Sequence, residues 1–356
     1  MTAADVAIVG AGPVGCALAL DLHRCGRPAL LCTKPGSGPV PRGPSRPIAL
    51  SHASRLILER IGAWNALQST PIRTIHVSQA GAFGRTRISA EDAGVPALGY
   101  VLDYGALAAA LFDLVVARGI ALAAAPPPAA ALLVHAEGSA PGDAEKDYRQ
   151  EALVTLVRTD PPAAGTAYER FTPEGPLALL PLEGRYAVVW AMAPERAATL
   201  ADAGERVFLD ALGAAFGDRA GIFLATEGRS RFPLALRVRA SRAGARQAYV
   251  GNTAQTLHPV AGQGLNLGLR DAWDLARLLH DATDPGDPQL LARYADSRRL
   301  DAGATIRITD LLAGAFTGSG PLLASARGAA MTALDAFSPA RRFFARRMIF
   351  GISAIP

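Results

Sequence analysis

The chain opens with apolar residues whose spacing changes within a few positions. Val6-Ala7-Ile8-Val9 is a short continuous apolar run, the pattern of a buried strand. Residues 16–25 then have a helical pattern that Gly26 can end, and a second apolar run covers 28–32. A strand, a helix and a strand within about 30 residues match the start of a β-α-β unit. The N-terminus therefore predicts a parallel sheet.

The rest of the chain mixes both patterns. Helices are predicted over 51–61, 107–116, 197–216 and about 265–279, and helices fill most of the chain after residue 279. Strands are predicted over 74–77, 132–134, 153–157 and 187–190, with a turn at Gly81 after the first of them. The stretch 121–131 is nearly all Ala and Pro, which favours a linker. No internal repeat is found.

Composition and charge narrow the class of protein. The chain has 356 residues, of which 50% are hydrophobic and 19% charged. This length predicts about two domains with a large hydrophobic core, and this composition argues against disorder. The net charge of +5 is a mild excess, and we expect no nucleic-acid partner. Cys16, Cys25 and Cys32 are odd in number and lack a C-x-x-C pair, which argues against disulfides and zinc.

Targeting and membrane segments are not predicted. The apolar run over 6–20 follows Asp5, has no basic flank and is interrupted by glycines, so it is a poor signal peptide. The most apolar later stretch, 119–134, is broken by three consecutive prolines and cannot span a bilayer. We therefore expect a cytoplasmic protein. We also expect no metal site.

The turn after the first strand has chemical meaning. It reads G-x-G-x-x-G between a strand and a helix, the context in which this motif binds dinucleotides. The first glycine permits the tight turn, the second lets a pyrophosphate approach, and the third lets helix and strand pack closely. The helix N-terminus offers amide groups to the phosphates. The expected cofactor-binding residues here are Gly10, Gly12, Pro13, Val14 and Gly15.

The second strand ends at a position where dinucleotide-binding proteins normally have an acidic residue for the ribose. Thr33 stands there, followed by Lys34. A threonine hydroxyl can still bond a ribose, and the lysine would favour a nearby phosphate. We place both at the adenosine end of the cofactor. The turn by itself leaves FAD, NAD and NADP open.

A second glycine motif occupies residues 251–271. Its sequence is Gly251-Asn252-Thr253-Ala254-Gln255-Thr256-Leu257-His258-Pro259-Val260-Ala261-Gly262-Gln263-Gly264-Leu265-Asn266-Leu267-Gly268-Leu269-Arg270-Asp271. It consists of a strand end, a Gly/Pro loop and a helix start, whose amides can stabilise an anion. On spacing alone it is only a second candidate anion site.

The residue identities in this motif are more specific than the spacing of its glycines. It resembles the flavin-binding motif of aromatic-ring flavoprotein monooxygenases, and within them the UbiH/VisC-type ubiquinone-biosynthesis hydroxylases, with Asn252 in place of the usual Asp. Residues 46–51, 75–78, 171–181 and 231–234 resemble further segments of that family. Thr33, Glu137-Gly138, Gly105 and the Ala/Pro stretch depart from its pattern.

The resemblance implies an α/β fold in two parts. A three-layer, Rossmann-like FAD-binding domain with a parallel sheet would comprise 1–73, 98–149 and 241–310. An inserted α+β substrate domain with a mixed or antiparallel sheet would comprise 74–97 and 150–240, and 311–356 would form a C-terminal helical region.

The resemblance also implies a reaction. It is the hydroxylation of a polyprenylated phenol in ubiquinone biosynthesis, with FAD as cofactor, NAD(P)H as co-substrate and O2, through a flavin C4a-hydroperoxide. Two alternatives stay open: a non-catalytic or weakly flavin-binding partner in the same assembly, and a hydroxylase of a small soluble aromatic.

Individual site residues follow from the same resemblance. Arg46 would lie near the diphosphate or the nicotinamide path, and Asn252 would contact the ribityl chain. The residues expected along the flavin ring are Pro259, Gly262, Gln263, Gly264, Leu265 and Asn266. No catalytic residue is assigned. His258 borders that ring and could relay the phenol proton, although bonding to a loop carbonyl is the favoured interpretation. His76 and Trp190 are expected to be sheet residues.

The C-terminal stretch 341–350 is basic and amphipathic. Such a helix can lie on the anionic inner membrane, where a polyprenylphenol resides, or pack its apolar face on the core. Both interpretations stay open. The family resemblance also implies other ubiquinone-biosynthesis proteins as candidate partners.

Overall fold

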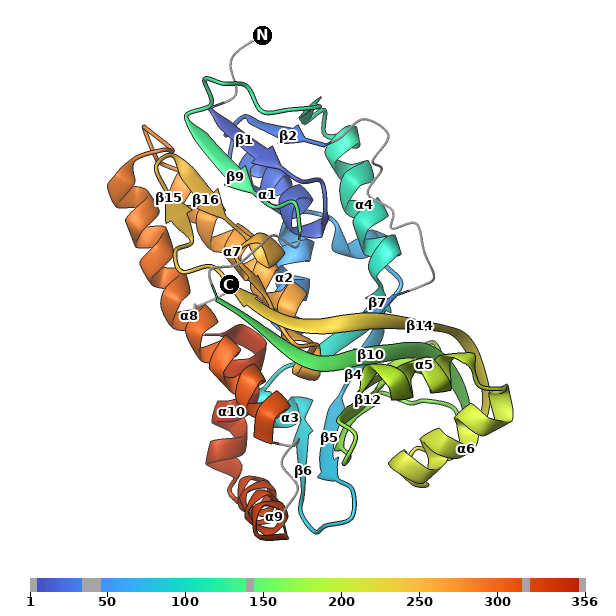
Figure 1. Cartoon of the computed structure of the whole chain (residues 1–356). Helices are drawn as coiled ribbons and strands as arrows, with labels where there is room; N and C mark the ends of the chain where they lie inside the picture. The colour runs from blue at the N-terminus through green and yellow to red at the C-terminus, as the bar shows by residue number, and fades with distance from the viewer. Residues whose placement is uncertain (1–4, 34–45, 139–143, 316–320, 352–356) are drawn as a thin grey trace.

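The computed structural model describes residues 5–33, 46–138, 144–315 and 321–351. Lys34, which was placed at the adenosine end of the cofactor, lies outside the described residues. Figure 1 shows one sheet near the N-terminus and a larger sheet below it, which includes the two long strands β10 (Ala144–Asp160) and β14 (Ile222–Val238).

The first sheet has six strands in the order β15-β16-β9-β1-β2-β8. β1 (Val6–Val9) pairs in parallel with β2 (Ala29–Cys32) and β9 (Leu132–His135). β8 (Ala121–Ala123) and β16 (Gln247–Tyr249) extend it in parallel, and β15 (Ala243–Gly244) adds an antiparallel edge. This confirms the predicted Rossmann-like parallel sheet.

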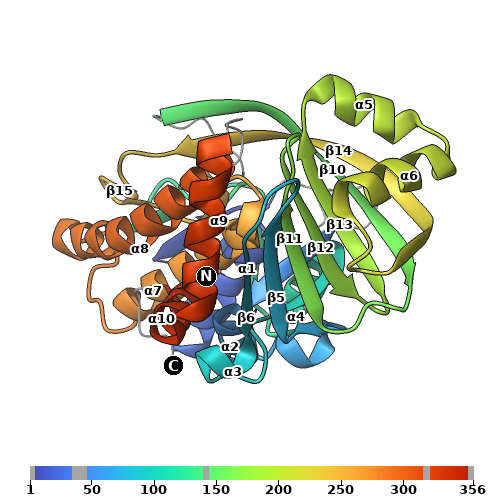
Figure 2. The same cartoon turned by 90° about the horizontal axis from the view of Figure 1, so that it is seen from below.

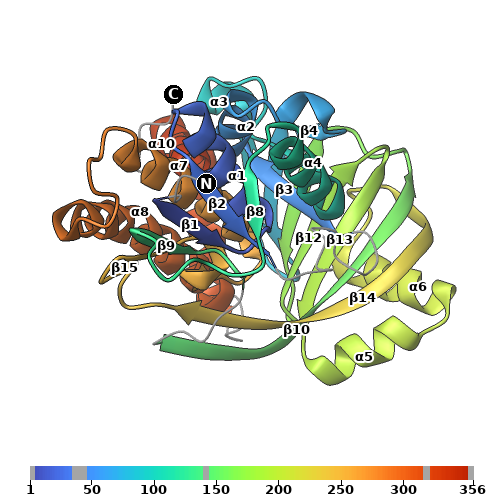
Figure 3. The ribbon, with the colours of Figure 1, turned by 90° about the horizontal axis from the view of Figure 1, so that it is seen from above.

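Three helices pack with this sheet into the largest core cluster. α1 (Pro13–Arg24) contacts both α4 (Tyr104–Ala117) and α7 (Gln263–Leu279). Leu18 of α1, Leu31 of β2 and Leu275 of α7 are fully buried in this cluster. The near-continuous apolar run of β2 is the pattern of a strand in a buried parallel sheet. Figure 3 shows α1 and α4 from above beside the strands β1, β2 and β8.

A third, smaller sheet is antiparallel. Its order is β3-β7-β4, with β3 over Pro47–Ser51, β7 over Gly99–Asp103 and β4 over Thr70–Ile72. α2 (His52–Arg60) follows β3 directly, and the Ser51 hydroxyl caps it by accepting from the Ser54 amide. A short 3-10 helix spans Trp64–Ala66.

The larger sheet has eight strands in the order β17-β14-β10-β13-β12-β11-β5-β6. All neighbours are antiparallel except β5 (Thr74–Gln79) and β11 (Thr166–Phe171). The other strands are β6 (Arg85–Ser89), β12 (Pro176–Leu182), β13 (Arg185–Met192) and β17 (Gln255–Thr256). This is the mixed sheet that the resemblance implied.

Two helices cover the outer face of the larger sheet, and three more helices form the C-terminal part of the described chain. α5 (Pro194–Asp202) and α6 (Glu205–Phe216) bury Leu200, Phe208 and Leu212 against Trp190 in a second core cluster. α8 (Pro288–Ala315), α9 (Pro321–Ala336) and α10 (Ser338–Phe350) end the described chain, and α3 (Ala90–Ala93) contacts α10. The predicted C-terminal helices are confirmed.

Two predictions about elements were wrong in detail. The helix predicted over 197–216 is interrupted, because Ala203 and Gly204 have extended backbone between α5 and α6. The supposed linker 121–131 contains β8, whose alanines complete an edge of the parallel sheet. Alanine is a weak strand former, so only the pairing with β2 makes this segment a strand.

Candidate functional site

The first glycine motif forms a tight connection between β1 and α1. Gly10 has a φ of +111°, which L side chains rarely adopt, and its amide donates to the Cys32 carbonyl at 2.9 Å. A Cβ on Gly15 would collide with the Gly10 carbonyl. A Cβ on Gly12 would meet nothing within 4 Å. Gly10 and Gly15 are thus required by the backbone, whereas Gly12 leaves the helix N-terminus open.

The second motif meets the first through Val14. A Cβ on Gly268 would lie 2.8 Å from Val14 Cγ2 and 3.0 Å from the Gly251 Cα, so two glycines let α1, α7 and the 251 turn approach closely. Gly262 precedes α7 with a φ of +59°, and no side chain caps this helix. Two uncapped helix N-termini, those of α1 and α7, are therefore brought to one region.

Asn266 connects the second motif to β3. Its Oδ1 accepts from the Ser51 amide and the Ser54 hydroxyl, both at 2.7 Å. Its Nδ2 donates to the carbonyls of Ala49 (3.0 Å) and Gly262 (2.7 Å). The side chain amide thus has protein partners on both ends, and its role is to position the loop rather than to offer free polar atoms.

A cavity of about 800 Å³ lies where these segments meet. Of the predicted site residues, its lining includes Gly10, Gly12, Pro13, Val14, Arg46, Asn252, Pro259, Gly262, Gln263, Gly264, Leu265 and Asn266. Segments far apart in the sequence therefore share one site. Thr33 follows β2 and donates its amide to the Ala123 carbonyl, but it and Gly15 are not among the described lining residues.

The opposite wall of the cavity is mostly apolar. Aliphatic side chains come from the larger sheet, among them Ile75, Val77, Val154 and Leu180. The C-terminal helices add Met331, Leu334, Phe344, Met348 and Ile349. A cavity with polar backbone at one end and an apolar wall at the other suits a ligand with both characters.

Arg46 stands at the edge of the cavity. Its backbone amide donates to Asp103 Oδ2 at 3.1 Å, and its guanidinium lies 5.5 Å from the centre of the Tyr104 ring and 5.4 Å from that of Phe232. Burial raises the pKa of Tyr104. Asn252 is exposed in the turn after β16 and also lines the cavity.

His258 is buried beside the cavity, and its environment differs from the prediction. Its Nδ1 accepts from the Val260 amide at 3.1 Å, so the ring bonds an amide and not a loop carbonyl. Burial lowers its pKa to about 4, which keeps the ring neutral near pH 7 with the proton on Nε2. Nε2 has no partner among the described residues.

Glu169 is a site residue that sequence reasoning missed. It lies on β11 between the cavity-lining residues Ala167 and Phe171, and its cross-strand neighbours are Val77 and Ala178. Burial raises the pKa of its carboxyl group to about 8. The signal was a single acidic residue on the apolar face of a strand, which becomes visible only when the face is known.

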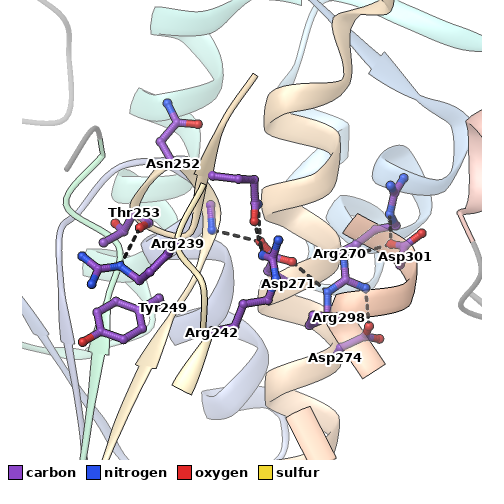
Figure 4. A network of polar contacts seen from close by, with 12 residues as sticks. Arg239, Arg242, Tyr249, Asn252, Thr253, Arg270, Asp271, Asp274, Arg298 and Asp301 are labelled. Atoms are coloured by element: carbon purple, nitrogen blue, oxygen red, sulfur yellow. Dashed lines mark hydrogen bonds and ion pairs between the residues drawn. The ribbon is translucent and has the colours of Figure 1, made fainter. Parts of the chain in front are cut away.

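A buried charge network fixes the turn that carries Asn252 (Figure 4). Asp271 Oδ2 accepts from the Gly251 amide at 3.1 Å and from Gln255 Nε2 at 2.8 Å. Its Oδ1 accepts from Arg298 Nε at 2.7 Å, and Arg298 also pairs with Asp274 (2.7 Å) and Asp301 (2.9 Å). α7 and α8 therefore hold the turn through ion pairs and hydrogen bonds.

Other predicted residues lie outside this cavity. His76 and Trp190 are strand residues of the larger sheet, as predicted, and neither is among its described lining residues. In α10, Ala345 and Ile349 are buried, and Arg341 pairs with Asp92 at 3.0 Å. This helix thus packs its apolar face on the molecule. The three cysteines are unpaired, and the described residues contain no group of metal-ligating side chains. No described helix is long and apolar enough to cross a membrane.

Solved structures share this fold. p-Nitrophenol 4-monooxygenase PnpA of Pseudomonas putida superposes with a TM-score of 0.76 over 98% of both chains at 15% identity. HpxO of Klebsiella pneumoniae, solved in complex with FAD, gives 0.72 over 98% of this chain and 99% of that one at 14% identity. At these identities the likeness shows a shared fold and nothing further.

Sequence relatives define the family. A family model described as an FAD binding domain matches residues 141–309. The ubiquinone hydroxylase UbiL of Rhodospirillum rubrum is 31% identical over 96% of this chain and 89% of its own. The 3-demethoxyubiquinol 3-hydroxylase of Escherichia coli K12 is 26% identical over 93% and 94%. The chain belongs to the family of FAD-dependent ubiquinone-biosynthesis hydroxylases.

The residues of the site fit FAD. The open Cα of Gly12 and the uncapped α1 can receive a pyrophosphate, and the uncapped α7 points a positive helix end at the same cavity. As a member of this family, the chain is an FAD-dependent enzyme, with the fold and the cofactor that the resemblance implied.

Proposed function

We propose that this protein hydroxylates the aromatic ring of a polyprenylated phenol, with NAD(P)H as reductant and O2 as oxidant. In balance, the phenol, O2, NAD(P)H and one proton give the hydroxylated ring, water and NAD(P)+. The observation that carries the proposal is the cavity of about 800 Å³ that runs from the glycine motifs to an apolar wall. Such a wall can take a prenyl chain.

We propose that different groups of the predicted residues bind different parts of FAD. Gly10, Gly12, Pro13, Val14 and Gly15 would form the pyrophosphate end. Thr33 and Lys34 would lie at the adenosine and Arg46 at the diphosphate or nicotinamide path. Asn252 would meet the ribityl chain, and Pro259 with residues 262–266 would lie along the flavin ring. Bound FAD would supply the redox chemistry that takes electrons from NAD(P)H and delivers oxygen to the ring.

The protein's own groups would prepare the phenol. Glu169 lies in the apolar wall, where its carboxyl group can form a hydrogen bond with the ring hydroxyl and transfer a proton to or from it. His258, neutral with a proton on Nε2, is a second donor beside the same cavity. The aliphatic wall excludes water, which strengthens each of these polar contacts.

The cellular place follows from the substrate. The protein would work in the cytoplasm at the surface of the inner membrane. Arg342 and Phe343 on the exposed side of α10 would face the lipid, and the latter is 74% exposed. Other ubiquinone-biosynthesis proteins would be partners there.

The test is turnover by the purified, FAD-loaded protein. NAD(P)H oxidation should rise when a polyprenylphenol is added, and mass spectrometry should find the hydroxylated ring. A prenyl-free phenol of the same ring is the control for a small soluble substrate. A folded protein that retains little FAD and forms no product would instead support the non-catalytic partner.

A further inference from the structure

The larger sheet has a second face, opposite to the one that supplies most of the cavity lining. Successive side chains of a strand point to opposite faces. On β5, Val77 lines the cavity while Ser78 lies on the other face, and on β11 Glu169 and Arg170 divide in the same way. A polar pocket of about 560 Å³ occupies that other face.

Three arginines from separate elements line this pocket, which we call the arginine pocket. Arg85 comes from β6, Arg170 from β11 and Arg219 from the turn after α6. Ser78, Gln79, Thr332 and Asp335 complete its polar lining. In Figure 2, α9 lies on one side of β5 and β6 and α6 on the side of β11. The pocket therefore gathers positive charge between four elements.

Arg170 and Arg219 contact neutral groups. Arg170 Nε donates to the Ala215 carbonyl at 3.1 Å, and its Nη1 donates to Ser78 Oγ at 3.4 Å. Arg219 Nη1 lies 2.9 Å from His76 Nε2. Within the described parts of the chain, none of the three has an ion pair. The one described carboxylate in the lining, Asp335, accepts the Arg87 amide at 2.7 Å.

The neighbouring pKa values reflect this excess of positive charge. The pKa of Arg170 is lowered by burial and then by the charge of Arg219. The pKa of His76 is lowered by burial and then by Arg219 and Arg85, although Asp335 opposes this. The positive charges thus repel one another and oppose protonation of His76. An anion in the pocket would relieve the repulsion.

We propose that the arginine pocket binds a phosphoryl group. The planar guanidinium donors match the oxygens of a phosphate, and three of them around one pocket suit a doubly charged group. The group could belong to an anionic phospholipid or to a soluble phosphate ester. The pocket is on the opposite face from the cavity, so this inference does not depend on the proposed reaction.

The experiment is calorimetric titration of the FAD-loaded protein with inorganic pyrophosphate at constant ionic strength. Loading with FAD keeps the glycine turn occupied. The double variant Arg170→Gln/Arg219→Gln should bind at least about tenfold more weakly. Arg85→Gln should also weaken binding, and because this side chain is exposed the fold should tolerate it. The matched control is Arg206→Gln, an arginine of α6 with a 95% exposed side chain.

Binding to vesicles of phosphatidylcholine, with and without phosphatidic acid, distinguishes a lipid headgroup from a soluble phosphate as the source of the phosphoryl group. Binding to the acidic vesicles that the double variant loses, and the control keeps, assigns the pocket to a lipid headgroup. Pyrophosphate binding without vesicle binding assigns it to a soluble phosphate. The proposal is overturned if the wild-type protein binds neither, or if all variants bind as tightly as the wild type.

Discussion

At the scale of single residues, the glycines of the first motif have separable roles. Gly12→Ala adds a methyl group that meets no protein atom within 4 Å, but this methyl group would occupy the face that we propose for the pyrophosphate. We expect an unchanged melting temperature of the apoprotein and FAD binding weakened at least about tenfold. Fluorimetric titration with FAD measures this.

Gly15→Ala provides the contrast. Its methyl group would collide with the Gly10 carbonyl, so α1 must shift from β1. We expect a lower melting temperature of the apoprotein as well as weaker FAD binding. If Gly12→Ala destabilised the apoprotein as much as Gly15→Ala, the assignment of Gly12 to the cofactor would be wrong.

Glu169 gives a prediction about pH. Its pKa of about 8 in the folded chain is above that of an unfolded glutamate, about 4.3. Between these values the folded chain holds a proton that the unfolded chain releases, so rising pH favours unfolding up to about pH 8. The wild-type melting temperature should fall from pH 6.5 to 8 by about 2 °C more than that of Glu169→Gln.

That pH window separates Glu169 from His258. The pKa of His258 is lowered to about 4, so its effect is a loss of stability as the pH falls below 6.5. Thermal melts of both proteins from pH 5 to 9 measure the difference. Parallel curves above pH 6.5 would show that Glu169 is not held protonated by the cavity.

Some of these residue properties could be predicted from the sequence and others could not. The glycine motifs could be predicted because each glycine answers a local backbone requirement. The raised pKa of Glu169 depends on which face of β11 meets the cavity, and the acceptor role of His258 Nδ1 depends on the turn at Val260. Both are set by tertiary contacts that one residue's neighbours in sequence do not specify.

At the scale of elements, the network between α7 and α8 is a stability determinant. Arg298 is fully buried and pairs with three carboxylates. Arg298→Met would leave Asp271 and Asp301 buried without their common partner, a change that costs about 3–5 kcal/mol. The free energy of unfolding by urea measures this. Arg206→Met on the exposed side of α6 should have little effect.

The same variant should also affect the cofactor. Asp271 holds the Gly251 amide and Gln255, which flank Asn252. Loosening Asp271 should therefore lower FAD affinity even in solutions where Arg298→Met remains folded. An FAD affinity equal to that of the wild type would mean that the network stabilises the helices without positioning the turn.

Elements were predictable where one local pattern dominates. β1, α1 and β2 follow from apolar runs around a glycine turn, and α7 follows from its helical pattern. The break between α5 and α6 and the strand β8 were not predicted. In β8 the alanines have little strand preference, and pairing with β2 decides the outcome.

At the scale of the whole molecule, one cavity joins segments from both ends of the chain. The glycine turn near residue 10, the loop near 262 and the helices α9 and α10 all line it. The resemblance could imply this assembly only because the motif at 251–271 is specific; hydrophobic periodicity alone does not place the two motifs together. Their contact through Val14 is a property of the fold.

We propose above that the protein hydroxylates a polyprenylated phenol in this cavity. The most direct measurement is mass spectrometry of the product formed by the FAD-loaded protein with NAD(P)H, a polyprenylphenol and 18O2. We expect a phenol-dependent product that carries one 18O atom in the new ring hydroxyl. A protein that holds FAD and is reduced by NAD(P)H, yet leaves the phenol unchanged and forms only hydrogen peroxide, would contradict it.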